Sequence, residues 1–233
     1  MTCGVVLPAY NVARHLPELV VELRRVQPNV RILAVDDGSA DDTAAVARKL
    51  GLELIEHPQN RGKGAALMTG FGWAEDQGLE RVFTMDADGQ HLPREMQAFL
   101  DVMDSTDADI VVGSRMDQVG EMPWLRLMTN RFTSWVVSRL AGSRIPDSQN
   151  GFRLFRTSCL GGIRVRSTRF DFESEILVRL GRRGARIASA PITSVYGDER
   201  SSINPFVDTV RFFRLVLHLI LTLTPNERDG TSP

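Results

Sequence analysis

Short apolar runs alternate with amphipathic segments over the first half of the chain. The runs have the length of buried strands, and they predict strands at residues 3–8, 30–37, 52–57, 81–86 and 108–114. Between them, apolar side chains recur at helical spacing, which predicts helices near residues 13–26, 41–51, 63–77 and 93–104. Strands that alternate with helices in this way form a mostly parallel sheet with helices on both faces. The pattern therefore predicts a Rossmann-like α/β fold.

The second predicted helix has a capping pattern at its start. Ser39 precedes Asp42 by three residues, which is the spacing of a capping box. We therefore expect Ser39 to open this helix.

The alternation changes after residue 115. Residues 123–140 predict a long helix with Trp124, Leu127, Met128 and Trp135 on its apolar side. A strand at 150–156, a helix at 171–183 and a strand at 186–195 follow. Because no repeat or low-complexity linker interrupts the chain, we expect one domain over residues 1–203 with halves 1–115 and 116–203, then a C-terminal helix and polar tail over 204–233.

Charge is distributed unevenly along the chain. Residues 1–110 hold 10 basic and 18 acidic side chains, whereas residues 111–169 hold ten arginines and three acidic side chains. This suits the first region to a metal ion and the second to anionic groups, although unevenly spread surface charge is an alternative. The net charge of −1 indicates no nucleic-acid partner.

The cysteines and the N-terminus bear on the compartment. Cys3 and Cys159 are too few for a disulfide framework. The N-terminal residues lack a basic segment followed by a long apolar stretch, so we expect no signal peptide. Together these features predict a cytoplasmic protein.

Polar side chains follow four of the predicted strands. Ligands bind outside the carboxyl ends of the strands in such sheets, so a ligand site is expected there. The polar positions are Asn11, Asp36 with Asp37, Asp86 with Asp88, and Ser114 with Arg115.

Asp86 and Asp88 are candidate metal ligands. Two residues apart in extended chain, they point to the same side. Oxygen ligands suit Mg²⁺ or Mn²⁺, and the side-chain carbonyl of Gln90 could add a third oxygen. His91 is expected to be structural or to face solvent. An Asp-x-Asp pair alone also fits a solvated turn.

Five motifs occur in order: "VVLPAYN" (5–11), "VDDGSADDT" (35–43), "NRGKGAAL" (60–67), "MDADGQH" (85–91) and "VGSR" (112–115). Together they resemble the nucleotide-sugar-dependent glycosyltransferases of family 2, which have the GT-A fold. Within that family the chain is most similar to polyprenyl-phosphate sugar transferases of the dolichyl-phosphate mannosyl- and glucosyltransferase type. The resemblance covers roughly residues 3–203.

The resemblance implies a donor site for a nucleotide sugar in residues 1–115. Either Asp36 or Asp37 would hydrogen-bond the base or ribose, and Tyr10 would offer a stacking face. Lys63 would place a charge near phosphate, unless it is a solvent-facing helix start. The implied donor-binding residues are Pro8, Tyr10, Asn11, Asp36, Asp37, Gly62, Lys63, Asp86, Ala87 and Asp88.

The resemblance also implies an acceptor site in residues 116–203 together with Arg115. Arg115 and Arg131 would hold the phosphate of a polyprenyl phosphate, because guanidinium groups bind phosphate through paired hydrogen bonds, with Ser134 nearby. Asp147 and Gln149 would approach the sugar, although Asp147 after Pro146 also fits a turn. Other arginines of the long helix, Arg126 and Arg139, are expected to face solvent.

These roles imply an inverting, metal-dependent transfer of a hexose from a UDP- or GDP-linked sugar, with Asp86, Asp88, Arg115 and Arg131 as the catalytic residues. A phosphate acceptor is mostly dianionic near neutrality, since its second pKa is about 6, so it needs no strong base. A saccharide or small-molecule hydroxyl acceptor is the alternative, and it would need a base, for which Asp147 is the candidate. A nucleotide-binding protein without transfer activity is a further alternative.

The segment 204–223 raises the question of a membrane. Residues 210–223 are almost wholly apolar, but Arg214, His218 and Thr222 form one polar stripe at helical spacing. Fourteen residues of helix span about 21 Å, too short for a bilayer core of roughly 30 Å. The segment therefore predicts either a helix at the membrane interface or a helix docked on the protein or a partner.

Overall fold

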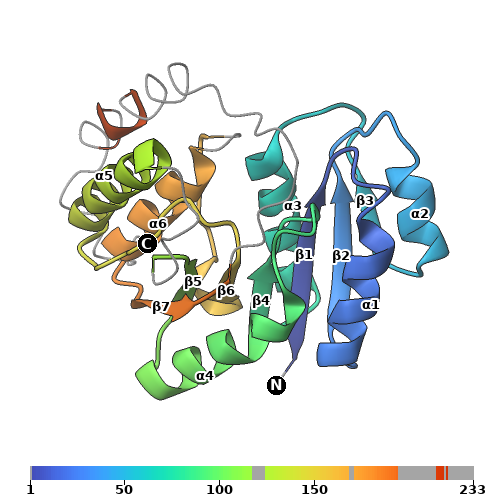
Figure 1. Cartoon of the computed structure of the whole chain (residues 1–233), viewed down its shortest axis with the longest axis horizontal. Coiled ribbons are helices and arrows are strands. Elements are labelled where there is room, and N and C mark those ends of the chain that lie inside the picture. The colour runs from blue at the N-terminus through green and yellow to red at the C-terminus, as the bar shows by residue number, and fades with distance from the viewer. Residues whose placement is uncertain (1, 117–123, 168–170, 194–213, 218, 220–233) are drawn as a thin grey trace, which may run out of the picture.

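A computed structural model describes residues 2–116, 124–167, 171–193, 214–217 and 219. Its centre is a seven-stranded sheet (Figure 1) with the strand order β3-β2-β1-β4-β6-β5-β7. The strands are β1 (Cys3–Ala9), β2 (Arg31–Asp36), β3 (Glu53–Glu56), β4 (Arg81–Thr84), β5 (Ile110–Ser114), β6 (Arg153–Arg156) and β7 (Ile187–Pro191).

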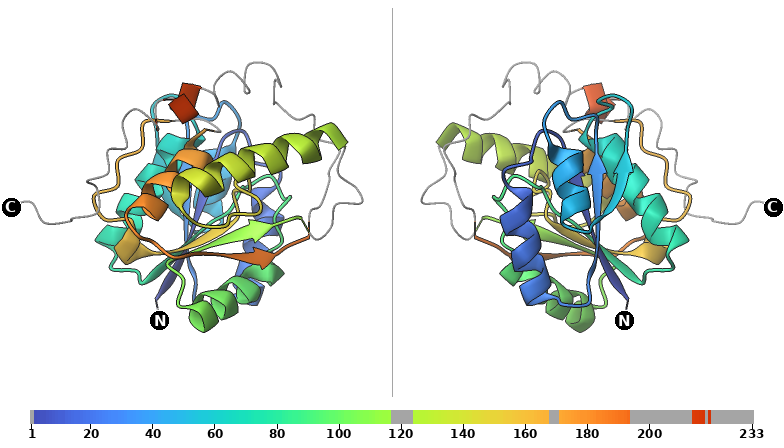
Figure 2. Two further views of the ribbon diagram at one scale, coloured as in Figure 1. Left: turned by 90° about the vertical axis from the view of Figure 1, so that its left-hand side faces the viewer. Right: turned by 90° about the vertical axis from the view of Figure 1, so that its right-hand side faces the viewer.

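Helices cover both faces of the sheet, as the sequence predicts. Apolar side chains of α1, α2 and α4 pack in a cluster on one face, and those of α3, α5 and α6 pack on the other. Figure 2 shows α4 on the opposite side of the sheet from α5 and α6. The helices are α1 (Leu16–Val26), α2 (Thr43–Lys49), α3 (Lys63–Asp76), α4 (Met96–Thr106), α5 (Trp124–Ala141) and α6 (Phe172–Arg182), with short 3₁₀ turns η1 (Pro93–Glu95) and η3 (Thr157–Cys159).

β6 runs antiparallel to both of its neighbours, β4 and β5, whereas the other paired strands are parallel. The sheet is thus mostly parallel, as predicted. Because β6 is reversed, its first residue lies at the edge where β1, β2, β4 and β5 end. The segment that leads into β6, residues 147–152, is therefore brought to the predicted ligand edge.

The predicted capping box is wrong. α2 begins after Asp42, which makes no side-chain capping hydrogen bond. The hydroxyl of Ser39 instead donates to Asp36 Oδ1 at 2.5 Å and accepts from the backbone amide of Asn11 at 2.9 Å. Ser39 therefore joins the loops after β1 and β2.

α5 is oriented against the usual rule for a surface helix. Its predicted apolar side does not face the core: Trp124, Met128 and Trp135 are 71%, 45% and 58% exposed. Its inner side carries Asn130 and Ser134, which are buried. We return to this helix below.

Two residues of the C-terminal segment are described in the core. Leu215 and Leu219 are buried in the cluster that contains α3, α5 and α6. At these two positions, the prediction of a helix docked on the protein is confirmed. Most of the segment for which a membrane helix was also predicted, 204–213, 218 and 220–223, lies outside the described residues.

Candidate active site

Lys63, at the start of α3, lies between two carboxylates. Its Nζ is 2.6 Å from Asp86 Oδ1, after β4, and 2.5 Å from Glu173 Oε1, at the start of α6. Burial would lower the pKa of Lys63, but the two carboxylates outweigh it and raise the pKa. Burial likewise opposes ionisation of Asp86, and the Lys63 ammonium overcomes it and lowers the pKa of Asp86. Lys63 is therefore a charged side chain of the site rather than a solvent-facing helix start.

Gly151 lets the segment before β6 approach this ion cluster. A Cβ at position 151 would lie 2.7 Å from Lys63 Nζ and 2.9 Å from Asp86 Oδ2. The backbone is held there by Thr84, whose hydroxyl donates to the Gly151 carbonyl at 2.8 Å. Only glycine leaves room for the lysine and the aspartate at this point.

Asp86 and Asp88 differ in their surroundings. Burial and the neighbouring Asp86 carboxylate raise the pKa of Asp88 above its usual value. Asp88 Oδ1 accepts a hydrogen bond from the backbone amide of Gln90 at 3.0 Å. Asp86 thus has a cationic partner in Lys63. The negative charge of Asp88 is unfavourable in these surroundings, and a cation would stabilise it.

His91 has the structural role expected of it. Its Nδ1 accepts a hydrogen bond from the backbone amide of Asp86 at 3.0 Å, and its ring stacks on Phe152 with centroids 5.4 Å apart. Burial lowers the pKa of the imidazole. His91 therefore fixes the backbone of the Asp-x-Asp turn as a neutral side chain.

The oxygen atoms present fit a hard divalent cation. Within the described ranges, no three His, Cys, Asp or Glu side chains gather closely enough to hold a metal by themselves. Mg²⁺ commonly takes one or two carboxylates and completes its shell with water and phosphate oxygens. Asp86 and Asp88 are two carboxylates of that kind, and the turn that carries them also holds Gln90, whose backbone amide bonds to Asp88.

Asp37 is committed to the loop between β3 and α3. It is 3% exposed, and its carboxylate accepts from the amides of Arg61 at 3.0 Å and Gly62 at 2.7 Å. His57 Nδ1 lies 2.7 Å from Asp37 Oδ1. The amide of Gly62, one of the implied donor-binding residues, thus points to Asp37 together with the amide of Arg61.

The other predicted donor residues lie on the loops after β1, β2 and β4. Tyr10 is 49% exposed, so its ring offers a free face, whereas Ala87 is buried in the core. Pro8 is half-buried in β1. The side chain of Asn11 accepts from the Ala40 amide at 2.8 Å, which ties the first two loops together.

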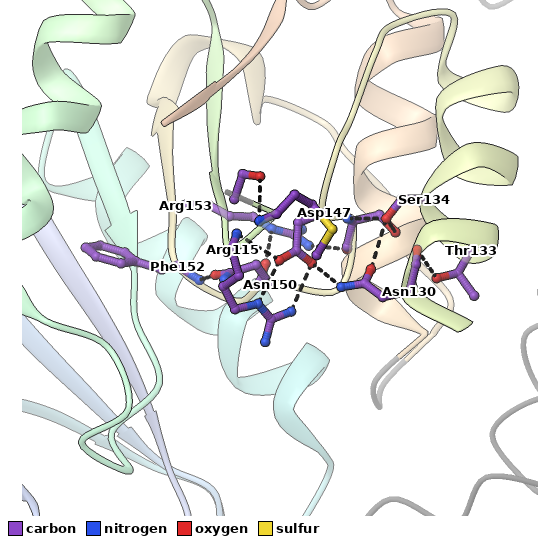
Figure 3. A network of polar contacts seen from close by, with 11 residues as sticks. Arg115, Asn130, Thr133, Ser134, Asp147, Asn150, Phe152 and Arg153 are labelled. Carbon is purple, nitrogen blue, oxygen red and sulfur yellow. Dashed lines mark hydrogen bonds and ion pairs between the residues drawn. The ribbon is translucent and has the colours of Figure 1, made fainter. Parts of the chain in front are cut away.

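Further along the same edge of the sheet, after β5, Arg115 is held by Asp147 (Figure 3). Arg115 Nε donates to Asp147 Oδ2 at 2.7 Å, and Nη2 donates to Oδ1 at 2.9 Å. Asn130 on α5 also donates to Oδ1, at 2.9 Å. Asp147 is 0% exposed; burial disfavours its ionisation, but the bonds from Arg115 outweigh this and lower its pKa. The structure thus places Asp147 beneath Arg115, with both oxygens bonded.

Ser134 connects α5 to the segment before β6. Its hydroxyl donates to Asn130 Oδ1 at 3.0 Å and accepts from the Ser148 amide at 2.9 Å. Gln149, one residue on, is exposed. Of the two residues predicted to approach the sugar, only Gln149 therefore reaches the surface.

A cavity of about 630 Å³ lies against α5. Arg131, Arg139 and Arg144 line it together with Ser134 and Trp135. Arg131 and Ser134 thus share a cavity, as predicted for acceptor residues, but Arg115 and Asp147 do not line it. Arg139 is exposed as expected and lies over the Trp135 ring at 5.8 Å; the side chain of Arg126 lies outside the described part of the chain.

Sequence reasoning missed several residues of this site. Arg153 is fully buried and donates to the carbonyls of Ser148, Asn150 and Glu173, so it joins the segment before β6 to α6. Glu173 is separated from its partner Lys63 by 110 positions. Neither residue belongs to a local motif. For Arg153, the one sign in the sequence is its charged side chain within the predicted strand "NGFRLFR".

The comparison with family models decides the classification. The model described as "Glycosyl transferase family 2" matches residues 4–170. The chain belongs to this family. The match confirms the resemblance that the five motifs indicated, and it spans Asp86, Asp88 and the arginine-rich residues 111–169.

The names of two curated relatives of this family 2 chain refer to a polyprenol monophosphomannose and to an undecaprenyl phosphate. Polyprenol monophosphomannose synthase of Mycolicibacterium smegmatis is 34% identical over 201 residues, covering 81% of this chain and 76% of the relative. Undecaprenyl-phosphate mannosyltransferase of Micrococcus luteus is 30% identical over 201 residues, covering 82% of each. The chain is therefore related to polyprenyl-phosphate sugar transferases.

Solved glycosyltransferases share the fold. Glucosyl-3-phosphoglycerate synthase of Mycobacterium tuberculosis, crystallised with Mn²⁺, UDP and its product, superposes with a TM-score of 0.65 at 17% identity, over 100% of this chain and 81% of that one. This likeness confirms the predicted GT-A fold. Within the described ranges, no helix is both long and apolar enough to cross a bilayer.

Proposed function

We propose that this family 2 glycosyltransferase moves a hexose from a UDP- or GDP-linked sugar to a polyprenyl phosphate, with inversion at the anomeric carbon. The arginine-lined cavity beside α5 carries the proposal. Three guanidinium groups suit a phosphate, which accepts paired hydrogen bonds from arginine. The names of the two curated relatives support the same acceptor.

The state of Asp147 favours a phosphate acceptor over a hydroxyl acceptor. A hydroxyl must lose a proton during transfer, so it needs a base within hydrogen-bond reach. The candidate base, Asp147, is buried with both oxygens bonded to Arg115 and Asn130. A phosphate oxygen already carries negative charge and needs no such base. Asp147 is then a positioning residue for Arg115.

For the donor, we assign the base or ribose contact to Asp36 rather than Asp37. The carboxylate of Asp37 is used by two amides and His57, whereas the amide and hydroxyl of Ser39 both donate to Oδ1 of Asp36. Tyr10 would stack on the base. Lys63 would place its ammonium beside the diphosphate, with Glu173 holding the lysine in place.

Mg²⁺ or Mn²⁺, held by Asp88, Asp86 and Gln90, would neutralise the charge that develops on the departing nucleoside diphosphate. Arg131 would orient the acceptor phosphate, and Ser134, whose hydroxyl donates to Asn130 Oδ1, would hold α5 against the segment before β6. The acceptor phosphate oxygen forms the new bond to the anomeric carbon while the bond from that carbon to the diphosphate oxygen breaks, and the electron pair leaves with the diphosphate. Attack opposite the leaving group inverts the anomeric centre.

An acceptor panel tests the proposal. The protein is incubated with radiolabelled UDP- and GDP-hexoses, Mn²⁺, and one of three acceptors: a short polyprenyl phosphate, the matching polyprenol, or 3-phosphoglycerate. We expect labelled product with the polyprenyl phosphate alone. Transfer to polyprenol or 3-phosphoglycerate would establish a hydroxyl acceptor, and nucleotide-sugar binding without product would establish a binding protein.

A further inference from the structure

The outer side of α5 carries a continuous stripe of large apolar side chains. Trp124, Met128, Phe132 and Trp135 are 71%, 45%, 47% and 58% exposed. Their spacing of four, four and three residues places them within an arc of about 80° on a helix. Phe132 and Trp135 stack on each other with ring centroids 6.3 Å apart. We call these four side chains the α5 stripe.

The inner side of the same helix buries polar side chains beside the apolar Val137 and Ala141. Asn130, Thr133 and Ser134 are buried there, bonded to Asp147, to Asn130 and to Ser148 respectively. A surface helix in water normally has the opposite arrangement, with its apolar side toward the core. α1 follows that rule, since Leu16, Leu19, Val20 and Leu23 are its buried residues.

Arginine is the charge that accompanies the α5 stripe. Arg131 and Arg139 fall within or beside the same arc of the helix, and both are exposed. They also line the cavity next to α5, together with Arg144 and with Trp135 of the stripe. α5 itself, residues Trp124–Ala141, contains no aspartate or glutamate. Within α5, aromatic rings are therefore combined with arginine and with no acidic side chain.

We propose that the α5 stripe docks the protein on the surface of an anionic lipid bilayer. Helices that lie in the membrane interface combine tryptophan, phenylalanine and other apolar residues on one face with arginine or lysine beside them. The 18 residues of α5 span about 27 Å as a helix, so the stripe would rest along the interface. The four apolar side chains enter the boundary between headgroups and acyl chains, and the arginines meet lipid phosphates.

Charge favours a bilayer over a second copy of the chain. In a two-fold symmetric dimer built on this face, the same patch contacts itself, which brings arginines near arginines. Anionic headgroups instead neutralise Arg131 and Arg139. The proposal rests on the surface of α5 and not on the proposed transfer reaction, although the two fit, because the cavity opens beside the stripe.

Vesicle flotation tests the proposal directly. A triple variant, Trp124→Ser with Met128→Ser and Phe132→Ser, removes stripe residues that do not line the cavity. A matched control, Val21→Ser with Leu217→Ser, removes two residues that are 65% and 59% exposed elsewhere. We expect wild type and control to float with phosphatidylcholine–phosphatidylglycerol vesicles, and the triple variant to bind about tenfold or more weakly, because three apolar side chains no longer leave water on binding.

Intrinsic fluorescence gives a second readout. The chain has three tryptophans; Trp73 is 7% exposed, whereas Trp124 and Trp135 are on the stripe. On anionic vesicles we expect a blue shift of emission and quenching by brominated phosphatidylcholine. Sucrose-gradient sedimentation without lipid checks for self-association.

Several outcomes would overturn the proposal. The first is equal vesicle binding by wild type and the triple variant, and the second is loss of binding in the Leu217-containing control alone. The third is tryptophan emission that brominated lipid does not quench in vesicle-bound protein. The fourth is a wild-type dimer that the triple variant does not form. Transfer to a short, water-soluble polyprenyl phosphate is measured in parallel and is expected to be unchanged in the triple variant. Loss of vesicle binding with intact transfer supports docking, and wild-type binding without any transfer would refute the proposed reaction while leaving docking in place.

Discussion

Asp37 in the first half of the chain and Asp147 in the second are both buried carboxylates near the ligand edge of the sheet, but they hold different partners. Asp37 accepts from two backbone amides of one loop, whereas Asp147 holds the guanidinium of Arg115. The first half therefore uses a buried charge to shape its backbone and leaves Asp88 in need of a cation. The second half uses one to position a cationic side chain.

An excess of arginine in one part of the sequence does not show which of the arginines contact a ligand. Ten arginines lie within residues 111–169, yet Arg115 and Arg153 are bonded to the protein's own groups. Arg131, Arg139 and Arg144 line the cavity instead. Burial and bonds to the protein distinguish the structural arginines from those that line the cavity. Substitutions at matched residues can test this distinction.

The largest effect is expected from Asp88→Ala. Metal-assisted departure of the diphosphate is worth several kcal/mol, so turnover should fall roughly a thousandfold or more. Because Asp88 is only partly buried and carries a raised pKa, the melting temperature should barely change. Steady-state kinetics with Mn²⁺ titration and calorimetry measure the two. Asp76→Ala, an exposed carboxylate at the other end of α3, is the control; unchanged turnover in Asp88→Ala would contradict its role.

Asp147→Ala should show the reverse pattern, with stability as the main loss. Removing one partner of a buried ion pair costs about 3–5 kcal/mol, or roughly 6–20 °C in melting temperature for a chain of this size. Thermal unfolding followed by circular dichroism checks this. A variant as stable as wild type would mean that Asp147 is not the internal partner of Arg115.

The Asp147 contribution should also depend on pH in a definite direction. Its folded pKa is lowered below the ordinary 3.8, so the unfolded chain takes up this proton first as pH falls. The stabilisation is present above pH 3.8 and is lost as pH falls toward the folded pKa. The stability gap between wild type and Asp147→Asn should therefore narrow at acidic pH, and a gap that widens there would contradict the assignment.

Among the arginines, Arg131→Ala is the clean test of acceptor binding. A charged hydrogen bond to phosphate is worth about 1.5–3 kcal/mol, so kcat/KM for a polyprenyl phosphate should fall roughly 10- to 100-fold. Nucleotide affinity, measured by calorimetric titration, should be unchanged. Arg115→Ala is less informative because it also leaves Asp147 buried and unpaired. Arg164→Ala, an exposed arginine, controls for charge, and an equal loss of nucleotide affinity in Arg131→Ala would move it to the donor side.

Gly151→Ala tests a contact between the two halves, because residue 151 belongs to the second half and meets Lys63 and Asp86 of the first. We expect this substitution to have the smallest effect on turnover. The new Cβ would crowd Lys63 and Asp86, and overpacking of this kind costs typically about 1–3 kcal/mol. We expect about a tenfold loss of kcat. Gly161→Ala is the matched control, since a Cβ at position 161 would lie 3.9 Å from its nearest neighbour, Glu75 Oε1, which is an ordinary contact. Equal kinetics in both variants would show that the ion cluster does not need its present geometry.

The sequence allowed the strands and helices to be located because their apolar periodicity is local. The reversed direction of β6 was not predicted, because a buried run such as residues 153–156 has the same pattern whether it pairs parallel or antiparallel. Asp86 and Lys63 were found through motifs, but Glu173 was not, because its contact with Lys63 exists only after α6 has packed.

The same limit explains α5. The sequence shows an apolar stripe at helical spacing, and the general rule places such a stripe against the core. The buried polar partners that reverse the helix, Asp147 and Ser148, follow α5 in the chain and reach it only through the turn before β6. The pattern of apolar residues alone does not show which side of a helix will meet buried hydrogen-bond partners in the folded chain.

The reversed strand β6 also sets a constraint on synthesis. β4 ends at Thr84 and its sheet neighbour β6 begins at Arg153, so about 70 residues must be added before β4 can pair on that side. At ribosomal speeds of about 5–20 residues per second, this takes roughly 4–14 s. During that interval the nascent chain has an unpaired, apolar strand edge, which is the surface on which aggregation and chaperone capture begin. Codon changes that lengthen this interval should lower the soluble yield without altering the finished protein.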